Sequence, residues 1–70
     1  MITVDATGLS CPEPVMLTKQ AVNDNPTEEV QVTVDNATAR DNIVRMARGI
    51  KRATSVQEEN GTYVITLTQK

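Results

Sequence analysis

Two short segments in the first half of the chain alternate between apolar and polar residues. In the first, Ile2 and Val4 alternate with polar neighbours, and in the second three valines alternate with polar residues. A period of two is typical of a strand that buries one face. The pattern therefore predicts strands over residues 2–5 and 30–34.

A helix is predicted between these strands, from Pro12 to about Asn23. Its apolar residues fit a helix seated on a sheet, and an Asn-Asp-Asn-Pro stretch ends it. Because methionines in helical stripes mostly serve packing, we expect Met16 and Met46 in the interior rather than at a metal. The apolar residues of this helix are Val15, Met16, Leu17, Ala21 and Val22.

A second helix is predicted over about residues 37–48. Thr38, followed three residues later by Asp41, resembles a capping arrangement at its start. Gly49 can take the left-handed conformation that closes a helix. The apolar positions at helical spacing are Ala39, Ile43, Ala47 and Ile50.

The segment 53–70 predicts two strands joined by a tight turn at Asn60-Gly61. The second of these strands carries Tyr63, Ile65 and Leu67 on one face. The element order is then βαβαββ, within a single domain spanning 1–70. We expect an α+β fold: a two-layer α/β sandwich with two helices on one face of a four-stranded mixed sheet. The other face is left to solvent or a partner.

Composition removes several classes of function. The 70-residue chain has one cysteine, no histidine, no tryptophan, one aromatic residue and a formal net charge of −2. Without histidine we expect no metal, no cofactor and no Cys/His nucleophile pair. The acidic charge and scarce aromatics argue against nucleic acid as a partner. No apolar run could cross a membrane and no leader is recognisable, so we expect a cytoplasmic location and a reduced thiol.

The only cysteine, Cys11, stands in the stretch Gly-Leu-Ser-Cys-Pro-Glu-Pro, residues 8–14. If Ser10 caps the first helix, Glu13 completes a capping box, but Pro14 then forfeits the first intrahelical hydrogen bond. If Cys11 is the cap, both prolines fall in the first turn, whose N–H groups have no intrahelical partner. The second register costs less.

In that register Cys11 lies at the positive end of the helix dipole, which favours a thiolate by about 0.3–1 kcal/mol, while Glu13 opposes it. We expect a modestly acidified, accessible thiol. The alternative is a small buried hydrophobe, since free cysteines are among the most buried residues. Just upstream, Asp5 either accepts backbone N–H bonds in the turn or is a plain polar strand end.

The stretch DATGLSCPEPVMLTKQAV, with its Cys-Pro-x-Pro core, resembles the TusA/SirA-like family of sulfur carrier proteins. In that family the motif cysteine accepts sulfur as a persulfide from a cysteine desulfurase and passes it to an acceptor. The resemblance implies that Cys11 is the carrier residue and that Gly8, Pro12, Glu13 and Pro14 shape the motif. Its implied partners are a cysteine desulfurase or other sulfur donor and a downstream acceptor protein.

A second stretch, VDNATARDNIVRMA, is similar to the N-terminal domain of YedF-like proteins. That branch is linked to selenium metabolism and often carries a second domain. The resemblance makes selenium an alternative cargo to sulfur.

Arg45, Arg48 and Arg52 recur at three- and four-residue spacing and predict a basic stripe, provided that the second helix extends so far. The stripe is either a solvated helix face or a docking surface for an acidic partner. Arg40 with Asp41 is interpreted as a helix-start pair of structural value.

Three functions follow as hypotheses. The first is a sulfur or selenium carrier that forms a persulfide at Cys11, a relay protein rather than a stand-alone enzyme. The second is a non-catalytic interaction or regulatory module that docks through the Cys-Pro-x-Pro edge and the arginines of the second helix. The third is a thiol-redox protein, which would need a mixed disulfide or a dimer because the chain has no resolving cysteine.

Overall fold

The computed structural model describes residues 2–9 and 13–68 of the chain. The order βαβαββ is confirmed, and the predicted helix start at Pro12 lies outside the described residues. Both helices end one residue later than their patterns predict. The elements are β1 (Ile2–Asp5), α1 (Glu13–Asp24), β2 (Val30–Val34), α2 (Ala37–Gly49), β3 (Thr54–Glu59) and β4 (Thr62–Leu67).

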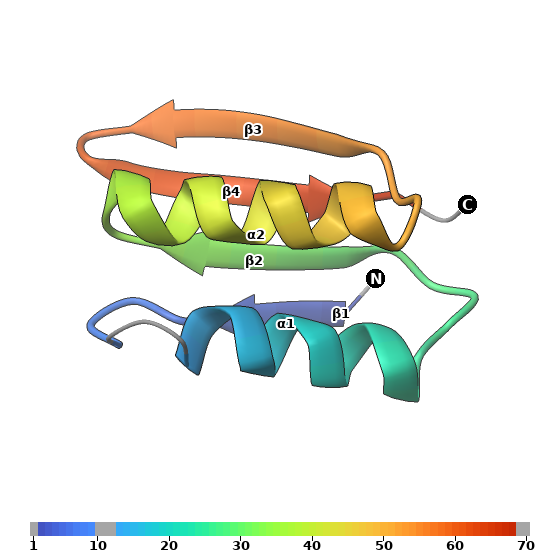
Figure 1. Cartoon of the computed structure of the whole chain (residues 1–70). Helices are drawn as coiled ribbons and strands as arrows, with labels where there is room; N and C mark the ends of the chain where they lie inside the picture. Colours follow the sequence, from blue (N-terminus) through green and yellow to red (C-terminus); the bar gives the residue numbers. More distant parts are fainter. Residues whose placement is uncertain (1, 10–12, 69–70) are drawn as a thin grey trace.

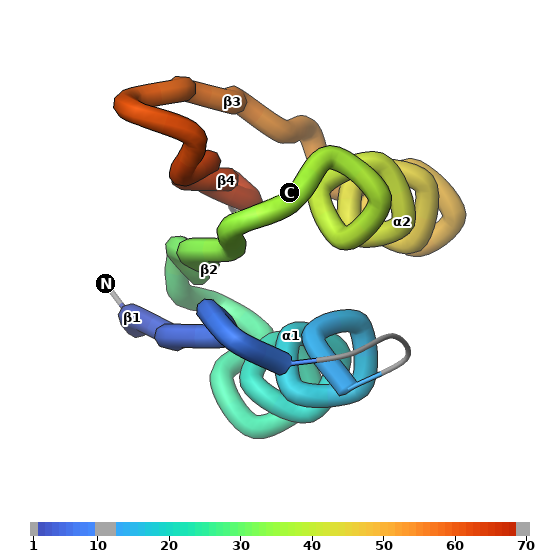
Figure 2. The backbone as a smooth tube through the Cα atoms, turned by 90° about the vertical axis from the view of Figure 1, so that its left-hand side faces the viewer, coloured from blue at the N-terminus to red at the C-terminus, as the bar shows by residue number. Residues whose placement is uncertain are grey.

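The strands form one mixed sheet in the order β1-β2-β4-β3. β1 and β2 are parallel, while β4 runs antiparallel to both β2 and β3. Figure 1 shows α1 and α2 lying in front of the sheet, and the end-on view of Figure 2 places both on the same side. The two-layer α+β architecture is therefore confirmed.

The core lies between the helices and the covered face of the sheet. Val4, Val32 and Ile65 face one another across three adjacent strands, so their side chains share this face. Tyr63 is half-buried on the same face. The buried apolar residues are Ala6, Val22, Val30, Val32, Val34, Ala39, Ile43, Ala47, Ile65 and Leu67. The predicted apolar face of β4 is confirmed.

The turn between β3 and β4 is the tight hairpin that the sequence predicts. Asn60 and Gly61 have φ values of 53° and 80°. Positive φ at both central residues is the requirement of the type I′ turn, whose twist matches that of the flanking strands. This turn fixes the register in which Thr62 pairs with Glu59.

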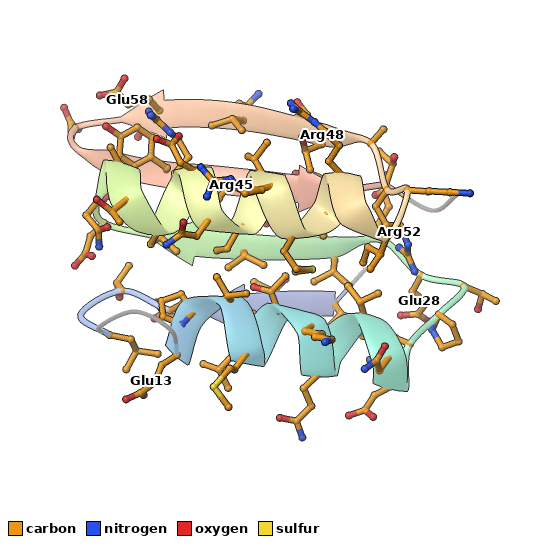
Figure 3. The ribbon with its side chains drawn as sticks, viewed as in Figure 1. Glu13, Glu28, Arg45, Arg48, Arg52 and Glu58 are labelled. Carbon is orange, nitrogen blue, oxygen red and sulfur yellow. The ribbon has the colours of Figure 1, made fainter. Side chains whose placement is uncertain are left out.

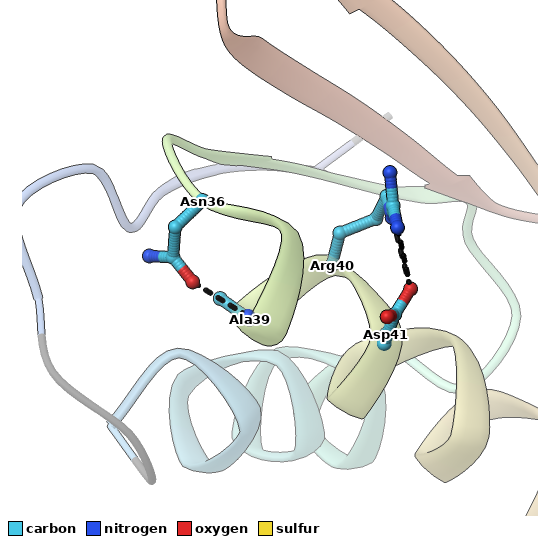
Figure 4. A network of polar contacts seen from close by, with 4 residues as sticks. All are labelled: Asn36, Ala39, Arg40 and Asp41. Atoms are coloured by element: carbon cyan, nitrogen blue, oxygen red, sulfur yellow. Dashed lines mark hydrogen bonds and ion pairs between the residues drawn. The ribbon is translucent and has the colours of Figure 1, made fainter.

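The start of α2 differs from the prediction. Asn36, not Thr38, is the N-cap: its backbone is extended, with φ −151° and ψ 156°, and its Oδ1 accepts the N–H of Ala39 at 2.7 Å (Figure 4). Because the helix begins at Ala37, Thr38 is its second residue and cannot cap it. Asp41 instead pairs with the neighbouring Arg40.

The end of α2 also differs. Gly49 is the last helical residue, and the left-handed residue is Lys51, with φ 63°. The N–H of Arg52 donates to Ala47 O at 2.9 Å, and the N–H of Lys51 donates to Arg48 O at 3.1 Å. These two bonds form a Schellman motif with lysine where glycine is the usual choice. The chain reverses here, so residue 52 does not continue the helix.

Candidate functional site

Cys11, Ser10 and Pro12 lie outside the described residues. The choice between the two capping registers, and the exposure of the thiol, therefore stay predictions. The described surroundings of Cys11 are its two flanks in the sequence: residues 6–9 upstream and the first turns of α1 downstream.

The upstream flank leaves β1 in a turn organised by Asp5. Its Oδ1 accepts the backbone N–H of Thr7 at 3.1 Å and the Thr7 hydroxyl at 2.7 Å. The hydroxyl bond, followed by the backbone bond, lowers the pKa of Asp5 below its ordinary value. The next residue, Ala6, is buried, and its N–H donates to Thr33 O at 2.8 Å. Of the two alternatives for Asp5, the structure shows the first, a side chain that accepts a backbone N–H bond in the turn.

Gly8 ties this flank to a distant part of the chain. Its φ is +77°, a conformation that strains other residues, and its N–H donates to Oδ2 of Asp35 at 2.9 Å. Asp35 follows β2 directly, and its Oδ1 accepts from the amide of Asn36 at 3.3 Å. The turn before the motif is thereby connected to the residue that caps α2.

Sequence reasoning missed Asp35. The signal that finds it is the parallel pairing of β1 and β2, which brings the residues after both strands to one edge of the sheet. An acidic residue directly after the second strand stands where it can accept N–H bonds from the turn after the first.

The downstream flank is anchored by Pro14. Glu13 is the first described residue of α1 and is exposed, whereas Pro14 is fully buried. Thr18, also fully buried, donates its hydroxyl to Pro14 O at 2.8 Å. Pro14, Thr18 and Val22 are the buried residues of α1, at a spacing of four. The second proline of the motif therefore lies on the buried side of α1.

The predicted interior position of Met16 is wrong. Its side chain is 62% exposed, and Leu17 is 37% exposed. At about 100° per residue, Met16 lies nearly opposite the stripe centred on Thr18. Met46, in contrast, is partly buried against the core, as expected. Met16 and Leu17 belong to a shallow hollow of about 590 Å³ along the outer side of α1, lined by Glu13, Met16, Leu17, Lys19, Gln20, Asn23 and Asp24.

The predicted arginine stripe is only partly correct. Arg45 and Arg48 are exposed on α2, as Figure 3 shows, but Arg52 is 8% exposed. Its guanidinium donates to the carbonyls of Pro26 at 2.9 Å and of Glu28 and Thr68 at 3.3 Å each. The reversal after α2 turns Arg52 away from the helix face and toward these carbonyls.

Arg40 and Asp41 form the predicted pair. Nε and Nη2 of Arg40 both lie 2.9 Å from Oδ1 of Asp41 (Figure 4). The guanidinium also lies over the ring of Tyr63, 4.7 Å from its centre. Arg40 thus links α2 to β4, which fits the expected structural value of the pair.

Within residues 2–9 and 13–68, no helix is long and apolar enough to span a membrane. The same residues contain no cluster of three or more His, Cys, Asp or Glu side chains that could hold a metal ion.

Two comparisons with known proteins match nearly the whole chain. The family model described as sulfurtransferase TusA matches residues 2–69. A solved structure, the SirA-like protein of Desulfitobacterium hafniense, is 35% identical over 97% of this chain and 96% of its own, with a TM-score of 0.89. The comparison with curated proteins gave no match. The chain belongs to the TusA sulfurtransferase family.

Proposed function

We propose that this protein is a sulfur carrier in which Cys11 accepts sulfur as a persulfide from a donor enzyme and passes it to an acceptor protein. Membership of the TusA family supports a sulfur carrier role. The observation that carries the proposal for this chain is that both flanks of the cysteine motif are held. Gly8 is hydrogen-bonded to Asp35 and Pro14 is fully buried, and each stands three residues from Cys11 in the sequence.

Fixed flanks suit a residue that must enter the active site of another protein. Ordering a loop on association costs about 0.5–1.5 kcal/mol for each immobilised side chain, and a loop that is ordered beforehand avoids part of that cost. The prolines restrict the backbone further. The contacts of Gly8 and Pro14 on either side of residues 10–12 would lower that cost.

The proposed transfer needs no cofactor and no net oxidation. The Cys11 thiolate attacks the outer sulfur of a cysteine persulfide on the donor. A new S–S bond forms at Cys11 while the S–S bond of the donor breaks, and the donor cysteine leaves as a thiolate. The acceptor thiolate then attacks the outer sulfur on Cys11 in the same way. In the capping register that the sequence predicts for Cys11, the N-terminus of α1 would favour the anion modestly, and Glu13 in the first turn would oppose it.

The donor is proposed to be a cysteine desulfurase, and the exposed side of α1 is a suitable contact for it. Met16 and Leu17 present apolar surface within the hollow that begins at Glu13, two residues from Cys11 in the sequence. A partner that receives Cys11 would cover this side of the helix.

Selenium delivered by the same attack is an alternative cargo. A lone thiol fits a reducing compartment such as the cytoplasm.

The test is incubation of the reduced protein with a cysteine desulfurase and cysteine, followed by intact-mass spectrometry. The proposal predicts an added sulfur that a reductant removes. Cys11→Ser is the control and should remain unmodified. An adduct that persists in Cys11→Ser, or no adduct in the wild type, contradicts the proposal. Repeating the reaction with selenocysteine distinguishes the two cargoes.

A further inference from the structure

A second surface, on α2, has features that the carrier chemistry does not use. Arg45 and Arg48 are exposed there, and with Asp41 and Val44 they line a hollow of about 180 Å³. Figure 3 shows both arginines on α2, on the other helix from the motif. We call Val44, Arg45 and Arg48 the α2 basic face.

The structure separates these two arginines from the other arginines of the chain. Arg52 is buried among carbonyls, and Arg40 is occupied by Asp41 and Tyr63. Between residues 13 and 68, the structure contains one ion pair, which joins Arg40 to Asp41. Arg45 and Arg48 have no such carboxylate partner in the described part of the chain.

In the described part of the chain, no carboxylate forms an ion pair with Arg45 or Arg48, although acidic residues outnumber basic ones. The chain has nine carboxylate side chains and seven cationic ones. Asp41 lies four residues before Arg45, a spacing that allows an ion pair, yet its carboxylate is bonded to Arg40. The α2 basic face is therefore a local cationic surface on an acidic molecule.

The geometry of this face fits carboxylates. Residues three apart on a helix have Cβ atoms about 5–6 Å apart, so the two guanidinium groups can approach one ligand together. Each guanidinium is a planar fork that binds a carboxylate through two parallel hydrogen bonds. Val44 is partly buried beside them and adds a small apolar contact.

The charge of the whole molecule selects among anionic partners. A long polyanion such as a nucleic acid would meet the surrounding excess of acidic groups, and the cations on α2 and just after it are few. A short segment with a few carboxylates and an apolar residue between them matches the α2 basic face in charge and size.

We propose that the α2 basic face docks an acidic, partly apolar peptide segment of a partner protein. The proposed contact does not involve Cys11, so it does not depend on whether the protein carries sulfur. In a carrier, it would add affinity for one partner without touching the reacting sulfur.

The experiment titrates the isotope-labelled protein with a short synthetic peptide that repeats Glu-Asp-Leu, at low ionic strength, and follows backbone amide shifts by NMR. Shifts should concentrate in residues 41–48. Arg45→Gln and Arg48→Gln should each weaken binding by about tenfold, as removal of one close charge pair does. Lys19→Gln, which removes one charge from α1, should leave the affinity unchanged, and so should Cys11→Ser.

Three results would overturn the proposal. They are no binding, equal weakening by Lys19→Gln, or tighter binding of a single-stranded oligonucleotide than of the peptide. Circular dichroism should show that the arginine variants remain folded, because both side chains are exposed. Loss of sulfur loading with peptide binding intact would count against the carrier function alone.

Discussion

The backbone N–H of Gly8 donates a hydrogen bond to the Asp35 carboxylate at 2.9 Å, across 27 positions of the sequence. This bond joins the turn before the cysteine motif to the start of α2. Asp35 also accepts from the amide of Asn36, whose Oδ1 caps the helix at Ala39. The position of the upstream flank therefore depends on the packing of α2 and not on local sequence alone.

Removing this acceptor should loosen the turn. Asp35→Ala is expected to raise the hydrogen exchange rate of the Gly8 amide about fivefold, because an exposed bond to a charged acceptor contributes about 1 kcal/mol. Asp35→Asn keeps an oxygen acceptor and should restore part of the protection. Asp24→Ala, at the far end of α1, is the control. Unchanged exchange at Gly8 in Asp35→Ala would show that the bond does not hold the turn.

Arg52 should contribute far more to stability than the exposed arginines of α2 do. Its guanidinium is nearly buried and satisfies three carbonyls from two separate segments of the chain. Arg52→Gln should lower the free energy of unfolding by about 2–3 kcal/mol, since it removes three part-buried hydrogen bonds from a charged donor. Arg48→Gln should change it by less than about 0.5 kcal/mol. Denaturant unfolding measures both changes. Equal effects of the two substitutions would contradict the stabilising role of the Arg52 hydrogen bonds.

Two substitutions at the end of α2 should stabilise the protein. Lys51→Gly relieves the left-handed backbone at φ 63°, and Gly49→Ala removes a flexible residue from a helical position where the added Cβ meets nothing within 4 Å. Each is expected to add about 0.5–1 kcal/mol to the free energy of unfolding. Thermal unfolding of the single variants tests this. A loss of stability in Lys51→Gly would mean that the Schellman turn does not form at Lys51.

The turn after β1 predicts a pH effect. The pKa of Asp5 is lowered in the folded protein by its bonds to Thr7, so the ionised carboxylate stabilises the fold above its unfolded pKa. This contribution is lost as the pH falls through the lowered pKa. Thr7→Val removes the hydroxyl bond and should move the Asp5 pKa back upward, as an NMR titration of the carboxyl carbon would show. No movement would assign the shift to another cause.

Much of the fold could be predicted because its signals are local. The valines of β2 and the Asn60-Gly61 turn specify a strand and a hairpin by period and backbone preference alone. Arg52 could not be placed, because its direction depends on the left-handed residue before it and on carbonyls brought near by the tertiary fold. Met16 was misplaced because the buried stripe of α1 runs through Thr18, a polar residue that hydropathy does not mark as core.

The cysteine motif can be recognised from the sequence. The structure adds what Gly8 and Pro14, on either side of Cys11, contribute to it. Pro14 was expected to shape the helix start, and its burial adds a packing role. Asp35 was missed because the link to Gly8 exists only once the parallel pairing of β1 and β2 is known. The exposure and reactivity of Cys11 stay predictions.

The most direct measurement of the central claim is a single-turnover transfer from a desulfurase preloaded with one labelled persulfide sulfur and freed of cysteine. The account predicts that label lost from the donor appears in equal amount on the peptide containing Cys11, with the donor returned as a free thiol. A stable mixed disulfide between the two proteins, or label that stays on the donor, would contradict it.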